Sequence, residues 1–113
     1  MSRTRFAVSI FLLSLTSSLL APLAHADEDL KLVLENHKFT PAEVRVPANK
    51  KIRIVIENRD DTPEEVESKG LHIEKVIAAK SKGVVSVGPL KPGNYTFYGE
   101  YNEATAQGVL IAE

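Results

Sequence analysis

The chain has 113 residues and carries 14 lysines and arginines against 15 aspartates and glutamates, a net charge of −1. This balance argues against a nucleic-acid partner and against binding to anionic lipid, because both require a strongly basic surface. There is no cysteine, and the single methionine is Met1. A disulfide, a cysteine nucleophile and a soft copper(I) site built on cysteine or methionine are therefore excluded for the folded protein.

The N-terminus has the pattern of a secretory signal peptide. Arg3 and Arg5 precede an apolar run at Phe6–Leu20, which is followed by the small-x-small sequence Ala24-His25-Ala26. The apolar run is too short for a stable transmembrane anchor. We therefore expect cleavage after Ala26, with a retained N-terminal anchor as the alternative.

The mature chain, residues 27–113, is expected to be one small periplasmic domain with no direct membrane insertion after removal of the signal peptide. Loss of Arg3 and Arg5 leaves 12 basic and 15 acidic residues, a net charge of about −3. Two histidines remain, His37 and His72. With no Gly-x-Ser-x-Gly sequence and no phosphate-binding glycine loop, the chain offers no support for hydrolase chemistry.

Short apolar-alternating segments separated by turn residues predict β-strands along the whole mature chain. The strongest signal is Lys51–Glu57, in which Ile52, Ile54 and Ile56 share one face. The strands are expected, in chain order, at Leu30–Leu34, Glu43–Val46, Lys51–Glu57, Glu64–Glu67, His72–Ile77, Val84–Val87, Tyr95–Gly99 and Gly108–Ala112. Phe39 is expected to be a buried anchor within a loop, and a small helical turn is considered at Ile77–Lys80. Seven or eight short strands with no long helical period predict an all-β, antiparallel Greek-key sandwich.

Four motifs in this order resemble the small periplasmic cupredoxins. They are Phe39-x-Pro41-x-x-Val44-x-Val46-Pro47-Ala48, Ile54-x-Ile56-x-Asn58 followed by Pro63, Leu90-Lys91-Pro92-Gly93-x-Tyr95-x-Phe97, and the strand–loop–strand segment Tyr95–Val109. The resemblance implies that Glu64, Gly99, Asn102 and Gln107 stand at the four positions of a blue-copper ligand set. Such a site requires a cysteine thiolate and two histidines. No type 1 copper is therefore expected.

Within the cupredoxins, the chain looks like the EfeO-type subgroup that is found beside bacterial iron permeases. The characteristic runs are Pro63-Glu64-Glu65-x-Glu67-Ser68, Ile73-Glu74-Lys75-Val76 and Gly99-Glu100 with Thr105-Ala106-Gln107-Gly108. Relatives in this subgroup usually have histidine where this chain has Asn102. The resemblance implies a periplasmic accessory protein of iron uptake, with periplasmic uptake proteins and a membrane iron permease as partners.

Carboxylates are the most abundant candidate metal ligands in the predicted loops and strands. The predicted ligands are Glu64, Glu65, Glu67, His72, Glu74 and Glu100, with weaker candidates at His37, Asn102 and Glu103. In the cupredoxin arrangement the loops after Asn58 and Gly99 meet at one end of the sandwich. Carboxylates and an imidazole there would suit Cu(II), Fe(II)/Fe(III) or Mn(II). Clustered carboxylates repel one another unless a cation neutralises them, which favours a metal ion as ligand.

Several alternatives stay open at this level. The Glu64–Glu67 run is also typical of a solvated strand that protects a sheet edge, with Lys69 and Lys75 as surface partners. A metal-free interaction module would explain Gly99 and Asn102, and a copper buffer or chaperone would use the same carboxylates with another metal preference. The sequence favours a binding protein over an enzyme, with a part in ferrous-iron oxidation as the alternative.

Overall fold

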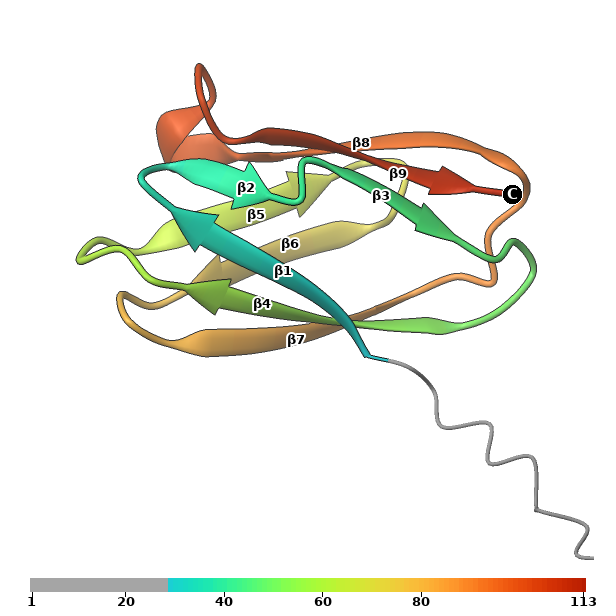
Figure 1. Ribbon diagram of the computed structural model, residues 1–113, viewed down its shortest axis with the longest axis horizontal. Coiled ribbons are helices and arrows are strands. Elements are labelled where there is room, and N and C mark those ends of the chain that lie inside the picture. The colour runs from blue at the N-terminus through green and yellow to red at the C-terminus, as the bar shows by residue number, and fades with distance from the viewer. Residues whose placement is uncertain (1–28) are drawn as a thin grey trace, which may run out of the picture.

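The computed structural model describes residues 29–113, which form two β-sheets packed face to face (Figure 1). The predicted signal peptide lies outside the described residues. The strands are β1 (Leu30–Glu35), β2 (Lys38–Thr40), β3 (Glu43–Val46), β4 (Ile52–Asn58), β5 (Glu64–Ser68), β6 (Ile73–Ile77), β7 (Lys82–Val87), β8 (Gly93–Gly99) and β9 (Gln107–Ala112), with a short 3₁₀ helix η1 (Glu100–Asn102) between β8 and β9. The predicted all-β sandwich is confirmed.

One sheet has the strand order β2-β1-β4-β7 and the other has the order β3-β9-β8-β5-β6. Most neighbours are antiparallel, but β1 pairs with β4 and β3 pairs with β9 in parallel. These two parallel pairs were not predicted, because the alternation of side chains sets the buried face of a strand but not its neighbour. Among the described residues, no helix is long and apolar enough to cross a membrane.

Two local predictions also need correction. Lys38–Thr40 is a three-residue strand paired with β1 rather than a loop, although Phe39 is buried as expected. This segment is too short to show a two-residue period. Nor is there a helical turn at Ile77–Lys80: Ile77 ends β6 in extended conformation, and the helical turn of this sandwich is η1.

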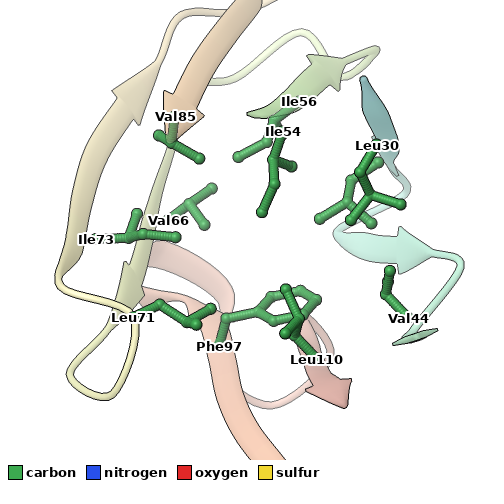
Figure 2. A pocket seen from close by; sticks show the side chains of 11 residues that line it. Leu30, Val44, Ile54, Ile56, Val66, Leu71, Ile73, Val85, Phe97 and Leu110 are labelled. Atoms are coloured by element: carbon green, nitrogen blue, oxygen red, sulfur yellow. The ribbon is translucent and has the colours of Figure 1, made fainter. Parts of the chain in front are cut away.

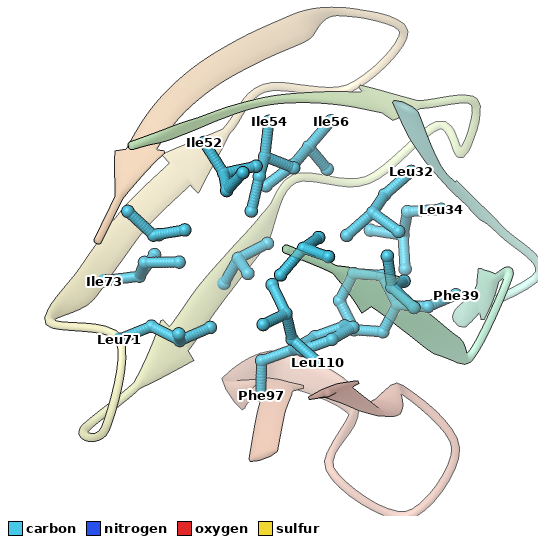
Figure 3. Packing of buried hydrophobic residues seen from close by; sticks show 14 of the residues in the cluster. Leu32, Leu34, Phe39, Ile52, Ile54, Ile56, Leu71, Ile73, Phe97 and Leu110 are labelled. Carbon is cyan, nitrogen blue, oxygen red and sulfur yellow. The ribbon is translucent and has the colours of Figure 1, made fainter. Parts of the chain in front are cut away.

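The core lies between the sheets and is built mainly from alternate, inward-facing residues of the strands (Figure 3). Ile52, Ile54 and Ile56 are buried on β4 as predicted. The rings of Phe39 and Phe97 meet edge to face, with centroids 5.0 Å apart. The space that remains between the sheets is about 10 Å³ and has a wholly apolar lining (Figure 2). It is too small and too apolar to hold a ligand or an ordered water molecule, so function has to be sought outside the core.

One end of the sandwich carries both the β4–β5 loop and η1 (Figure 1). Buried Asn58 shapes that loop: its side-chain amide donates hydrogen bonds to the carbonyl oxygens of Thr62, Ile77 and Ala78, and its Oδ1 accepts one from the Asp60 N–H. The loop thereby delivers Glu64 to the first position of β5. The fold thus brings the two predicted ligand loops to the same end.

Candidate functional site

The alternation of side chains along β5 sends its glutamates to opposite sides of the sheet. Glu64, Val66 and Ser68 are buried, whereas Glu65 and Glu67 are half-buried on the outer face. The two-residue period of a strand accounts for this division. It separates the run of glutamates into one internal carboxylate and two external ones.

Three carboxylates gather on the outer face, and we call Glu65, Glu67 and Glu100 the acidic triad. Each offers one oxygen atom, and these atoms all lie within 4.8 Å of one another. Glu67 lies opposite Tyr98 in the β5–β8 pairing, and the chain turns into η1 directly after β8. That turn lays Glu100 across β5, beside the two outward-facing glutamates. The described residues contain one such group of potential ligand side chains.

The pKa values of the three carboxyl groups in the acidic triad are shifted in different directions. Burial raises the pKa of Glu65 to about 7, and its hydrogen bonds with Glu67 and Glu100 add to the effect. The pKa of Glu67 is lowered, chiefly because the Tyr98 hydroxyl donates a hydrogen bond of 2.7 Å to its Oε2. The same bond raises the pKa of Tyr98 to about 12. The pKa of Glu100 is raised, chiefly by its hydrogen bond with Glu67. Three like charges at this distance are therefore costly without a cation.

The raised pKa of Glu65 predicts how the stability of the metal-free protein depends on pH. The folded state keeps this proton up to about pH 7, whereas the unfolded chain releases it near its ordinary pKa of 4.5. The stabilising contribution is therefore fully present below pH 4.5 and is lost as pH rises through about 7. We expect the melting temperature to fall more steeply between about pH 5 and pH 8 in the wild type than in Glu65→Gln. Parallel melting curves over that range would contradict the assignment.

The inward-facing Glu64 has different surroundings. Its side chain is buried, with 1% of its surface exposed. Oε1 accepts hydrogen bonds from the N–H groups of Tyr101 (2.8 Å) and Glu65 (3.1 Å), and Oε2 accepts one from Asn102 Nδ2 (2.6 Å). Within residues 29–113, no buried side-chain nitrogen or oxygen lacks a hydrogen-bond partner. The Glu64 carboxylate is thus fully satisfied by protein donors.

Three of the four expected copper-ligand positions do converge in space. Asn102 bonds to Glu64, and a Cβ atom on Gly99 would lie 2.5 Å from Glu64 Cδ. The fourth position was assigned wrongly: Gln107 is exposed, with its side-chain amide on the Glu103 carbonyl, and fully buried Ala106 lies next to Gly99. Counting back by twos from buried Leu110 and Ala112 would have shown that residue 106 faces inward. A carboxylate, a glycine and an amide do not fit type 1 copper.

The remaining predicted ligands lie apart from the triad. Exposed His72 sits in the β5–β6 turn at a φ of 55°, so β6 begins one residue later than predicted. Glu74 pairs with Glu67 across β6 and β5 but lies outside the group of three. His37 is in the β1–β2 turn, with its Nδ1 3.5 Å from Asp60 Oδ2. Glu103 is exposed in the loop after η1, where its backbone carbonyl oxygen accepts a hydrogen bond from the side-chain amide of Gln107.

Sequence reasoning missed two participants, the Tyr98 hydroxyl on Glu67 and the backbone N–H of Tyr101 on Glu64. Neither Tyr98 nor Tyr101 was among the predicted ligands. Its position on the same outer face as Glu67 follows from the alternation along β8, but their contact depends on the β5–β8 register. No local signal in the sequence sets that register.

Comparisons with known proteins agree with the fold described above. The family model described as cupredoxin-like domain matches residues 5–112. An uncharacterized protein of Rickettsia prowazekii, RP394, is 43% identical over 83 residues, which are 74% of this chain and 66% of that protein. The chain thus spans just under two thirds of that relative.

Solved structures with low sequence identity share the fold. The metal-binding domain of the Cu(I)-exporting P-type ATPase CopA from Streptococcus pneumoniae has a TM-score of 0.67 at 14% identity, covering 75% of this chain and 84% of that domain. Amicyanin from Paracoccus versutus has a TM-score of 0.60 at 15% identity, covering 76% of this chain and 82% of amicyanin. A purple cupredoxin from Nitrosopumilus maritimus has a TM-score of 0.59 at 14% identity, covering 75% of this chain and all of that protein.

Proposed function

Because the chain belongs to the family of cupredoxin-like domains, we propose that it is a metal-binding accessory protein whose site is the acidic triad rather than a blue-copper centre. The observation that carries this proposal is the convergence of three carboxylate oxygens within 4.8 Å, from β5 and η1, at the ligand end of the sandwich. These side chains offer only oxygen ligands, which suit the hard ion Fe(III) and also bind borderline ions such as Cu(II) and Fe(II). Cu(II) and Fe(II)/Fe(III) are the proposed ions.

We further propose that the protein acts outside the cytoplasmic membrane, in iron uptake. The signal-peptide pattern of residues 1–26 supports a periplasmic location, and the resemblance of the glutamate runs to those of the EfeO-type subgroup supports a role beside an iron permease. Carboxylate oxygens favour ferric over ferrous iron, so a bound ion would be held more tightly after oxidation. The protein would assist oxidation of iron, or its transfer to the permease.

A metal-free interaction module is the second candidate. The hydrogen bonds of Glu64 favour this candidate, because they join the positions expected for copper ligands through protein groups alone, without a metal ion. The side chain of Tyr101, which is 53% exposed beside this network, offers a contact surface for a protein partner. A copper buffer would use the triad itself and would differ from the leading proposal only in metal preference.

Metal titration of the metal-free protein, residues 27–113, tests the proposal. Thermal unfolding is followed while Cu(II), and separately Fe(II) under anaerobic conditions, is added. We expect the melting temperature to rise with metal concentration, since an ion that binds only the folded state stabilises it by mass action. No intense blue thiolate absorption is expected. If neither ion changes the melting temperature at large excess, the metal-binding proposal is wrong and the interaction module is favoured.

The chain offers a matched control for this titration. Glu74 lies opposite Glu67 on the next strand but outside the triad. Glu74→Gln removes one negative charge from the same face as Glu67→Gln does. The metal-induced rise in melting temperature of Glu74→Gln should therefore stay close to that of the wild type. An equal loss of the rise in Glu74→Gln and Glu67→Gln would place the ion elsewhere on this face.

A further inference from the structure

Hydrogen bonds connect β5 to the β8–β9 loop at the end of the sandwich that carries the acidic triad. In a blue-copper protein, the metal ion would connect these two segments. Glu64 begins β5, and Asn102 ends η1, 38 residues further along the chain. Their side chains bond directly, and the Tyr101 N–H bonds to the same carboxylate. We propose that the buried Glu64 carboxylate takes the structural place of the metal ion and positions the β8–β9 loop without any ion bound.

The absence of a side chain at Gly99 is what admits the carboxylate. A Cβ atom there would lie 2.5 Å from Glu64 Cδ, 2.8 Å from Glu64 Oε2 and 2.8 Å from the Ala106 Cβ. These separations are far below ordinary contact, so any side chain at position 99 competes with Glu64 for one volume. A cysteine ligand and this carboxylate are mutually exclusive. Gly99 and Glu64 therefore form a matched pair.

Backbone hydrogen bonds complete the arrangement on the loop side. The Gly99 N–H donates to the Ala106 carbonyl (2.8 Å), and the Ala106 N–H donates to the Asn102 carbonyl (2.8 Å). Asn102 therefore closes the loop with its backbone and fastens it to β5 with its side chain. Asn102 thus makes both the backbone hydrogen bond that closes the loop and the side-chain hydrogen bond that attaches the loop to β5.

The consequence concerns Glu100, which lies between Gly99 and Tyr101. Both neighbours are held against the Glu64 carboxylate, one by close packing and the other by a hydrogen bond. The backbone of Glu100 is thereby fixed over β5, although its own side chain is exposed. Glu64 is thus a positioning residue for the acidic triad and not one of its ligands. This last step rests on the proposed metal-binding function, whereas the loop-ordering step does not.

Amide hydrogen exchange in the presence of a chelator tests loop ordering without reference to metal. We expect the Tyr101 amide to be protected in the wild type and to exchange at least about tenfold faster in Glu64→Ala, because its acceptor is gone. Glu64→Gln should restore protection: its amide oxygen can accept from Tyr101, and its NH₂ group can donate to an Asn102 side chain turned by 180°. Asn102→Ala, which keeps the loop backbone, should give an intermediate loss. Fast exchange of Tyr101 in the wild type, or equal protection in Glu64→Ala, would overturn the inference.

Metal affinity, measured on the same proteins, tests the positioning step. Loss of an outer support of a metal site typically costs about 10–100-fold in affinity, so this is the loss expected for Glu64→Ala. Glu64→Gln should bind within about tenfold of the wild type, since it keeps the geometry. Glu67→Gln should weaken metal binding while leaving Tyr101 protected. If Glu64→Gln loses as much affinity as Glu67→Gln, Glu64 is a ligand and the inference fails. If the wild type binds no metal, the proposed function fails, while the exchange data still decide loop ordering.

Discussion

Replacing Gly99 with alanine is expected to lower the free energy of unfolding by about 3 kcal/mol. The new methyl group would overlap the Glu64 carboxyl group and the Ala106 Cβ. Overpacking of a filled interior costs about 1–3 kcal/mol, and displacement of the carboxylate removes charge-assisted hydrogen bonds as well. Glu64 cannot move away at low cost, because its two oxygens are already engaged by Tyr101, Glu65 and Asn102. Urea unfolding measures the effect.

Gly93→Ala is the matched control for this substitution. Gly93 lies at the other end of the same strand, and a Cβ atom there would meet the Tyr95 ring at 3.8 Å and the Lys91 carbonyl at 4.0 Å, both ordinary contacts. We expect its unfolding free energy to stay within about 0.5 kcal/mol of the wild type. Equal stabilities of Gly99→Ala and Gly93→Ala would show that the Glu64 carboxylate does not fill this site tightly.

Replacing all three triad glutamates with glutamine is expected to abolish metal-induced stabilisation. For the wild type, an ion at a hundredfold excess over its Kd adds about 2.7 kcal/mol, which corresponds to a rise of about 10 °C or more in a domain of this size. The variant lacks the anionic oxygens that bind the ion, so its melting temperature should not respond. Metal-free, it should melt above the wild type at pH 8, because the repulsion among Glu65, Glu67 and Glu100 is gone.

The two readouts separate metal binding from simple repulsion. Relief of repulsion would raise the metal-free melting temperature whether or not the protein binds metal. Only a metal site predicts that the response to Cu(II) or Fe(II) disappears with the same substitutions. A full metal response in the triple variant, together with a raised metal-free melting temperature, would mean that the triad is a surface cluster and that the ion binds elsewhere.

The sequence predicted the faces of the strands better than their partners. The two-residue period correctly put Ile52, Ile54 and Ile56 on one face of β4, and all three are buried. The parallel pairing of β1 with β4 and the three-residue strand β2 were missed. Pairing depends on contacts between segments far apart in the chain, and a very short strand carries no period.

For the candidate site, the sequence named the residues but not their roles. Glu64, Glu65 and Glu67 stood together as predicted ligands, and the structure gives Glu64 an internal network and the other two an outer face shared with Glu100. The grouping of Glu100 with β5 arises from the turn at Gly99 into η1, which brings the loop over the sheet. The hydrogen bond from Tyr98 to Glu67 could not be predicted without the β5–β8 register.

A crystal structure of the Cu(II)-loaded protein tests the central proposal most directly. We expect the ion within coordination distance of the carboxylate oxygens of Glu65, Glu67 and Glu100. Glu64 should still accept hydrogen bonds from Tyr101 and Asn102, as it does here. An ion bound to Glu64 with this network broken, or bound at the turn of His72, would contradict the proposed site.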